Sequence, residues 1–409
     1  MPSGRGAVVF AAALALWLVA RIAGSPTLHI IAVGLAVLPI AAIAYTRWSR
    51  QRLRVRRRLS DQRVQPGRRV TVELEIENES PASTSFLLLE DAIPPGLGRP
   101  ARLVLTGIHA RGTTRASYSL VAQSRGRYSL GPLSVDVSDP FALTRSRIAF
   151  AGRDDLVVTP VVEELEAGPA SPFGQTSGLS LAKHLFRTGE EFFTMRAYQE
   201  GDDLRRIHWP SVARSGELMI RQDESTRRSS AVLYLDTRQS ALGQGRAPAF
   251  ERAVSAAASI GMLLTRHGFT MRLSTMQLAP TSVSEDQLLD TLAGISHDGT
   301  RSSSHALSRL RSAASAEATL VAITAPPDAS ELAGLVRVGS VFGPRLAILV
   351  YPTDPASLPP DRQGQLEGRA SSARLSLSRS GWEVLVLAPD DRLRDVWQRS
   401  RTALPALSG

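Results

Sequence analysis

The chain has 409 residues, with 48 lysine and arginine residues against 38 aspartate and glutamate residues, and a formal net charge of +10. It contains no cysteine, which excludes disulfides, thiolate metal sites and cysteine nucleophiles. Residues 1–69 hold twelve arginines and one aspartate, so the remaining 340 residues sum to −1. The high charge therefore belongs to the N-terminal segment and indicates membrane topology better than nucleic-acid binding.

Two apolar stretches, Ala7–Ala20 and Leu28–Tyr45, flank a Gly-Ser-Pro-Thr turn. At about 1.5 Å per helical residue, each is just long enough to cross a hydrocarbon core of roughly 30 Å. We predict a transmembrane helical hairpin over residues 1–46. The alternative is that the first stretch is a cleaved signal peptide, because Arg5 precedes an apolar run. The second span, which follows immediately, favours the hairpin.

A basic segment, residues 47–69, follows the second span and carries seven arginines between Arg47 and Arg58. Arginine clusters favour the cytoplasmic side of a membrane. We therefore predict a multi-pass protein of the inner (plasma) membrane with cytoplasmic soluble domains. The segment is interpreted as a neck on anionic lipid. Nucleic-acid binding by this neck is the less favoured alternative, and no nucleic-acid partner is predicted.

Residues 70–162 predict an antiparallel β-sandwich, because Val70 to Glu77 alternates apolar and charged residues. Turn residues separate the other predicted strands, which are 86–89, 103–105, 116–121, 128–130, 133–137 and 156–158. Nothing in this module indicates catalysis. Residues 163–188 are rich in Gly, Pro, Ser and Ala, a composition typical of an interdomain linker.

Residues 189–228 interleave carboxylates, guanidiniums and aromatic rings in a way that amphipathicity does not explain. Arginine forks pair with carboxylates, so the segment is predicted to join domains or to bind a protein partner. Its candidate residues are Glu191, Phe192, Arg196, Tyr198, Gly201, Asp202, Asp203, Arg205, Arg206, His208, Trp209 and Arg214. The alternative is a hydrolase that uses Asp202, Asp203 and His208 as acid, base or metal ligands.

The string from Gly189 to Arg221 resembles the signature of the family named domain of unknown function fifty-eight. The matching positions are Glu191-Phe192, Arg196 and Tyr198, Gly201-Asp202-Asp203, Arg206 with Ile207 and Trp209, and Ala213-Arg214. Ala197 departs from the family pattern, where glutamate is more usual, and Val212 replaces a small residue. The resemblance also extends to the two-span start and to the β module. It implies a membrane protein that works with a MoxR-type AAA+ ATPase in assembly, maturation or envelope stress.

Residues 229–409 alternate strand-like and helical segments, which predicts a doubly wound α/β domain. The apolar run 231–235 is typical of a strand buried on both faces. Further strands are predicted at 270–274, 320–324, 346–350 and 383–387, and helices at 250–264, 285–293, 306–316, 331–338 and 392–398. This order resembles a von Willebrand factor A-like domain, as the family resemblance also implies.

That second resemblance implies positions for a divalent cation after the first strand. Asp236 and Ser240 match the expected turn, and Thr300 matches a threonine loop, but Arg238 replaces a serine and Ala325 stands where an aspartate is expected. We therefore predict that the metal site is degenerate and binds no metal. We also predict that the Arg238 guanidinium takes the vacated position and pairs with Asp236.

The sequence has no phosphate-binding Gly-x-x-x-x-Gly-Lys-Ser/Thr motif, and its single lysine is Lys183. It also lacks the zinc-protease and nucleophile-elbow motifs. The leading hypothesis is a non-enzymatic, membrane-anchored scaffold or adaptor that binds proteins. Neither a cofactor nor a small-molecule substrate is predicted.

Overall fold

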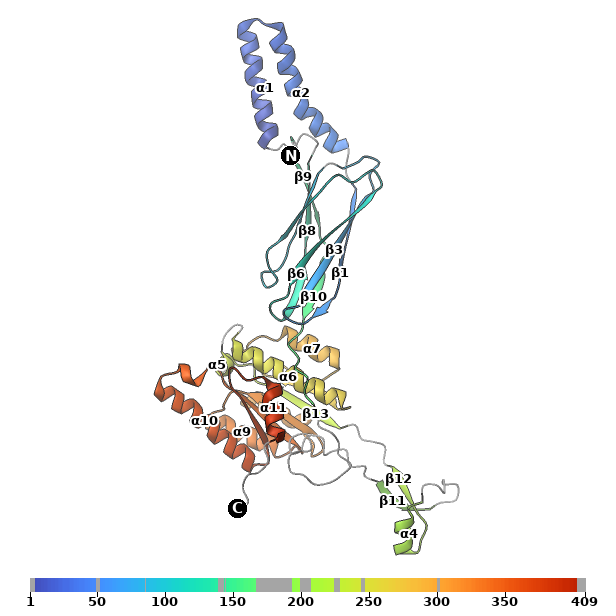
Figure 1. Cartoon of the computed structure of the whole chain (residues 1–409), viewed down its shortest axis with the longest axis vertical. Coiled ribbons are helices and arrows are strands. Elements are labelled where there is room, and N and C mark those ends of the chain that lie inside the picture. Colours follow the sequence, from blue (N-terminus) through green and yellow to red (C-terminus); the bar gives the residue numbers. More distant parts are fainter. Residues whose placement is uncertain are drawn as a thin grey trace. The chain divides into compact units, whose positions relative to one another are not determined.

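The computed structural model describes residues 4–48, 52–84, 86–138, 143, 145–166, 193–198, 207–223, 229–243, 247–299 and 302–402. The chain divides into two compact units, Met1–Thr159 and Pro160–Gly409 (Figure 1). The first contains the N-terminal helices and a β domain, and the second contains the α/β domain.

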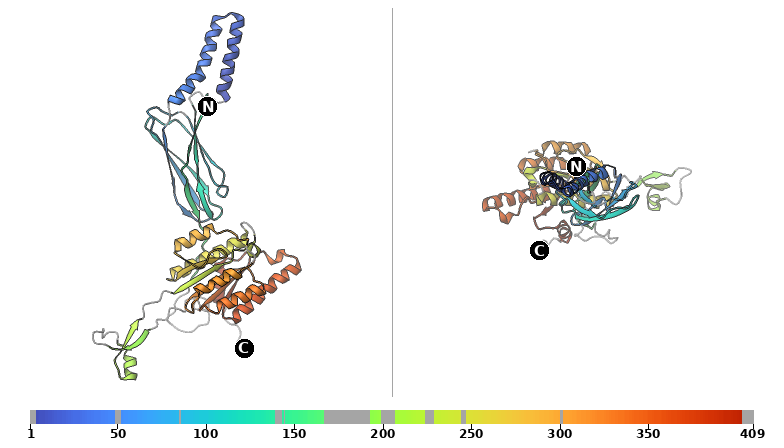
Figure 2. Two further views of the ribbon diagram at one scale, coloured as in Figure 1. Left: turned by 180° about the vertical axis from the view of Figure 1, so that it is seen from behind. Right: turned by 90° about the horizontal axis from the view of Figure 1, so that it is seen from above.

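The N-terminal stretches form helices α1 (Gly4–Ala23) and α2 (Pro26–Trp48), which lie side by side in Figures 1 and 2. Gly24 has a φ of 64°, a left-handed conformation that glycine adopts easily, and it joins the two helices. Both helices are long and apolar enough to cross a membrane. The predicted helical hairpin is confirmed as a pair of helices of this kind.

In the described part of the β domain, three sheets enclose one apolar core. Their strand orders are β1-β3-β6, β2-β10-β7 and β5-β4-β8-β9, antiparallel except for the β2–β10 pair. The strands are β1 (Leu53–Leu59), β2 (Arg63–Val64), β3 (Arg69–Asn78), β4 (Leu87–Asp91), β5 (Ala101–Leu105), β6 (Thr113–Val121), β7 (Gly126–Leu130), β8 (Leu133–Ser138), β9 (Arg145–Phe150) and β10 (Asp154–Val158). Every strand that the alternation predicted is present, and β1, β2 and β9 are additional.

The basic segment 47–69 requires a correction. Leu53–Leu59 is strand β1, paired in register with β3, and therefore belongs to the β domain. Its residues alternate between half-buried and exposed, and Arg57 is on the half-buried side. The two-residue alternation of this strand was not recognised from the sequence, because Arg57 occupies an inward position where an alternating strand is expected to have an apolar residue.

Arg57 is the centre of a polar network inside the β domain. Its side chain donates to both carboxylate oxygens of Asp91, at 2.7 and 3.1 Å, and to Asp154 at 2.7 Å. The Tyr118 hydroxyl donates to Asp91 at 2.6 Å. Burial lowers the pKa of Arg57, but its bonds to Asp91 and Asp154 outweigh burial, and the net pKa is raised. Burial and the bond to Asp91 together raise the pKa of Tyr118. The network joins β1, β4, β6 and β10.

The α/β domain contains a six-stranded sheet in the order β15-β14-β13-β16-β17-β18 within the described residues. The strands are β13 (Ser230–Leu235), β14 (Thr270–Thr275), β15 (Thr281–Val283), β16 (Thr319–Thr324), β17 (Arg345–Val350) and β18 (Glu383–Leu387). All are parallel except the edge strand β15. Helices α6 (Pro248–Arg266), α7 (Glu285–Gly294) and α11 (Leu393–Thr402) contribute to the core on one face. Helices α8 (Ser304–Leu310), α9 (Ala329–Gly339) and α10 (Pro360–Arg379) contribute to the core on the other. The doubly wound prediction is confirmed.

Two features of this domain differ from the predictions. Helix α10 was not predicted, because its only buried residues in the described chain are Ala370, Ala373 and Leu377, too few for a clear apolar stripe.

The start of the predicted linker is not a free segment. Glu163 accepts hydrogen bonds from the backbone of Leu393 and Arg394, and Trp397 donates to the carbonyl of Glu166 at 3.0 Å. Residues 167–188 of the linker lie outside the described residues.

We expect Asp91→Asn to lower the stability of the β domain by about 3–5 kcal/mol, because it leaves the buried Arg57 without its main counter-charge. Hydrogen exchange of β3 and β4 in the full chain, followed by mass spectrometry, measures this loss locally. The matched control is Glu90→Gln, one residue earlier, where the partners Arg102 and Arg147 are exposed. It should leave protection almost unchanged. Equal protection in the wild type and Asp91→Asn would contradict a stabilising role for the Arg57 network.

Candidate functional site

The topology of the α/β sheet marks one edge as the place for a site. The chain passes from β13 to β14 on one side, and after β15 it crosses to β16 on the other side of β13; both neighbours are parallel to β13. The strand order therefore reverses between β13 and β16, and ligands of open α/β sheets bind beyond the carboxyl ends at such a point. Asp236 directly follows β13, and its backbone N–H donates to Ile323 of β16 at 2.9 Å. We define the switch-point cluster as Asp236, Arg238, Thr324 and Glu331.

Arg238 fills the centre of the switch-point cluster. Asp236 is 1% exposed and Arg238 is 4% exposed. The Arg238 Nη2 donates to Asp236 Oδ2 at 2.6 Å, while Nε lies within 2.9 and 3.1 Å of the two carboxylate oxygens. Its Nη1 pairs with Glu331 on α9. The predicted pairing of Arg238 with Asp236 is confirmed, and Glu331 is an additional partner.

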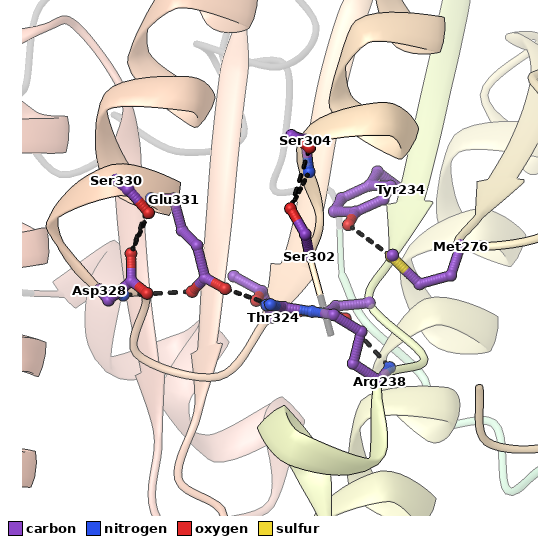
Figure 3. Close-up of polar contacts among 10 residues, drawn as sticks. Tyr234, Arg238, Met276, Ser302, Ser304, Thr324, Asp328, Ser330 and Glu331 are labelled. Atoms are coloured by element: carbon purple, nitrogen blue, oxygen red, sulfur yellow. Dashed lines mark hydrogen bonds and ion pairs between the residues drawn. The ribbon is translucent and has the colours of Figure 1, made fainter. Parts of the chain in front are cut away.

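Glu331 is held in position by the start of α9. Asp328 caps this helix and accepts from the Glu331 backbone N–H at 2.9 Å, while Glu331 Oε2 accepts from the Asp328 N–H at 3.1 Å. This reciprocal capping box fixes the Glu331 side chain. Its other carboxylate oxygen accepts from Arg238. Figure 3 shows the Glu331 carboxylate between Asp328 and the group formed by Thr324 and Arg238.

The electrostatics keep Arg238 charged. Burial lowers the pKa of its guanidinium, but hydrogen bonds to Asp236 and Glu331 outweigh burial, and the net pKa is raised. Thr324 adds a hydroxyl bond to Asp236 Oδ2 at 2.8 Å. Backbone and side-chain bonds from Glu331 and Ser330 lower the pKa of Asp328. The cluster thus contains two buried or half-buried carboxylates and one permanent cation.

A divalent cation does not fit this arrangement. Both oxygens of Asp236 already accept from Arg238, and the guanidinium would repel a second cation at the same place. In the described part of the chain, no three His, Asp or Glu side chains group as metal ligands. Arg238 supplies the positive charge that a cation would otherwise bring to this edge of the sheet.

The other predicted cation positions do not join the cluster. Ser240 is exposed on the short helix α5 (Gln239–Leu242), and Ala325 packs in the apolar core. Thr300 lies outside the described residues. Sequence reasoning missed Thr324 and Glu331. The spacing of Asp328 and Glu331, an acidic capping box before an apolar run, was the available signal for Glu331.

Part of the signature segment forms a small substructure. Strands β11 (Phe193–Ala197) and β12 (Met219–Asp223) pair antiparallel, and helix α4 (Trp209–Ser215) lies between them in sequence. The Tyr198 N–H donates to Leu218 at 2.8 Å, and a His208 ring nitrogen lies 2.9 Å from the Ser211 hydroxyl. Trp209 is 66% exposed. Arg214 is also exposed.

The remaining signature positions lie outside the described residues. They are Glu191, Phe192, Gly201, Asp202, Asp203, Arg205 and Arg206. The Arg196 backbone is part of β11. The hydrolase alternative requires Asp202 and Asp203 beside His208 and stays a prediction. The described contact of His208 with Ser211 is a local bond at the start of α4.

We expect Arg238→Ser to destabilise the α/β domain by about 3–5 kcal/mol, because it leaves the Asp236 and Glu331 carboxylates unpaired. Urea denaturation of the full chain in detergent, followed by hydrogen exchange of β13 and α9, measures this loss. The matched control Arg399→Gln removes an exposed pair with Asp391 and should change stability by less than about 1 kcal/mol.

The same variant tests what Arg238 replaces. With the guanidinium removed, the oxygens of Asp236, Thr324 and Glu331 are ligands suited to Mg²⁺. We expect Mg²⁺ to raise the thermal unfolding temperature of Arg238→Ser but not of the wild type. Micromolar Mg²⁺ binding to the wild type, removed by Asp236→Ala in titration calorimetry, would show that the guanidinium does not exclude the cation.

The chain was compared with known proteins. It is 24% identical over 219 residues to the uncharacterized protein YeaD of Bacillus subtilis, a match that covers 52% of this chain and 53% of that protein. The match thus spans about half the length of this relative.

Solved structures give only weak likenesses. A CARDB domain from Pyrococcus furiosus matches with a TM-score of 0.21 and 11% identity, over 26% of this chain and 93% of that domain. The alkylpurine DNA glycosylase AlkC of Pseudomonas fluorescens matches with a TM-score of 0.19 and 14% identity, over 35% of this chain and 42% of that one. Scores this low carry no argument about fold or function.

The family comparison covers most of the signature segment and most of the α/β domain. Residues 194–394 of this chain match the family described as "Protein of unknown function DUF58", the family that the signature motif resembles.

Proposed function

We propose that this protein is a membrane-anchored, non-enzymatic adaptor that binds other proteins through its soluble domains. The main support for the proposal is that the Arg238 guanidinium occupies the switch point, where it pairs with Asp236 and Glu331. A position where an open α/β sheet commonly holds a reactive ligand is here closed by an internal ion pair. This arrangement favours a recognition role over chemistry at that edge.

We propose further that the α/β domain is of the von Willebrand factor A-like type. Its support is the order of the sheet, five parallel strands with the antiparallel edge strand β15, and the cluster that follows β13. The partner that we propose is a MoxR-type AAA+ ATPase. Such a partner would supply nucleotide hydrolysis, for which this chain has no phosphate-binding loop.

Exposed apolar side chains in the signature segment support a docking role. Trp209 at the start of α4 is 66% exposed, and Leu218 before β12 is 43% exposed. Tryptophan is enriched in the energetically dominant positions of protein interfaces. We therefore propose that Trp209 and Leu218 contribute to the contact with the partner.

The partner is tested by purification from a detergent extract and mass spectrometry. We expect an AAA+ ATPase to co-purify with the wild type, and its yield to fall for the Trp209→Ala, Leu218→Ala double variant. Leu375→Ala, which removes an exposed leucine from α10, is the matched control and should retain the ATPase. If no AAA+ ATPase is enriched with the wild type over a mock purification, the partner proposal is wrong.

The membrane topology can be tested in a background without cysteine. We propose that α1 and α2 cross the inner membrane and that both termini are cytoplasmic. A membrane-impermeant maleimide should then label Thr27→Cys, an exposed position in the first turn of α2, in intact spheroplasts. It should label Ser372→Cys, on the exposed side of α10, only after lysis. The reverse pattern would invert the topology, and labelling of both sites before lysis would indicate that the helices are not inserted.

A further inference from the structure

A pocket of about 240 Å³ lies beside the switch-point cluster in the α/β domain. It is lined by residues of α8, of α9 and of the short turn η3 (Arg311–Ala313) that follows α8. Leu307 and Val338 give it an apolar part. Its one acidic lining residue in the described chain is Glu331, whose carboxylate is already bonded to Arg238 and to the Asp328 N–H.

Two guanidiniums also line this pocket. Arg311 comes from η3 and Arg337 from α9. Neither side chain has an ion-pair or hydrogen-bond partner in the described part of the chain. Arg57 and Arg238, in contrast, are each paired with two carboxylates. The pocket therefore carries positive charge that the described residues do not neutralise.

A buried serine contributes a hydroxyl to the pocket. Ser303 lines the pocket and is 5% exposed, but its hydroxyl makes no side-chain cap bond to α8 and has no partner among the described residues. Its neighbours differ, since the hydroxyls of Ser302 and Ser304 bond to each other at 2.9 Å and Ser330 donates to Asp328. The Ser303 side chain is therefore an enclosed part of the pocket wall, and its hydroxyl is available to bond to a group bound there.

We propose that this pocket binds a phosphate group, with Arg311 and Arg337 as its charged donors and Ser303 as a hydroxyl donor. Two guanidiniums match the charge of a phosphate dianion, and guanidinium–phosphate bonds are short and directional. The volume is below the usual range for drug-sized ligands, which suits a phosphate with a small organic substituent against Leu307 and Val338. The proposal is independent of the adaptor function.

The test is isothermal titration of the full chain in detergent with inorganic phosphate and, separately, with phosphoserine amide. Potassium chloride at matched ionic strength and acetate are the reference solutes. We expect saturable binding of phosphate by the wild type. The Arg311→Gln, Arg337→Gln double variant should bind about 10-fold more weakly or worse, because it loses the charge-assisted hydrogen bonds, and Ser303→Ala should bind more weakly than the wild type. Arg374→Gln, an exposed arginine on α10, is the matched control and should bind like the wild type.

Three outcomes would overturn the proposal: phosphate affinity equal in the wild type and the double variant, no heat above the chloride reference, or acetate binding as tightly as phosphate. Tighter binding of phosphoserine amide than of inorganic phosphate would identify a phosphorylated side chain as the source, and equal binding would identify free phosphate.

Hydrogen exchange of α8 and α9 with and without phosphate gives a second measurement on the wild type. Phosphate should slow exchange in these two helices and leave α10 unchanged, and unchanged exchange in α8 and α9 at saturating phosphate would contradict the pocket.

Discussion

The ion pair of Arg238 with Asp236 and Glu331 is the constraint on which the α/β domain depends. It lies where the strand order reverses, and it bonds the loop after β13 to the first turn of α9. Removing one partner from such a buried group leaves an uncompensated charge, whereas the complete group adds little net stability. We infer that the cluster contributes mainly conformational specificity, because it holds the loop after β13 and the first turn of α9 in one arrangement around a buried guanidinium.

The β domain contains a second group of the same design. Arg57 is shared by Asp91 and Asp154, and Tyr118 donates its hydroxyl to Asp91, just as Thr324 donates to Asp236. In both groups the planar arginine fork contacts one carboxylate through two nitrogens and reaches a second carboxylate with the third. Each group connects segments that are distant in sequence. In a chain without cysteine, disulfides are not available for this purpose, and these two buried arginines supply long-range polar links instead.

The phosphate pocket that we propose shares Glu331 with the switch-point cluster. The two features therefore differ in what their arginines do, although they are adjacent. Arg238 is neutralised inside the protein, while Arg311 and Arg337 have no partner in the described chain. This difference follows from position. Arg238 lies just after the central strand β13 and is enclosed by β16 and α9. Arg311 and Arg337 lie on the outer layer of helices. An adaptor built in this way would have an inert sheet edge and a recognition pocket next to it.

The sequence by itself determined the elements with a clear period: the two apolar helices, the alternating strand β3, the buried strand β13 and the alternation of strands with helices in the second unit. The resemblance to a von Willebrand factor A-like domain also led to the predicted pairing of Arg238 with Asp236, because Arg238 stands where that resemblance implies a metal-binding serine. The sequence did not predict strand β1, since the buried Arg57 breaks the apolar alternation, or helix α10, whose buried face is narrow.

The tertiary structure alone completed the switch-point cluster. Thr324 and Glu331 are 88 and 95 residues from Asp236 in the printed sequence, and only the pairing of β13 with β16 brings them to it. The pocket of Ser303, Arg311 and Arg337 likewise arises from the packing of α8 beside α9, because burial and the absence of partners are properties of packed neighbours and not of any single segment.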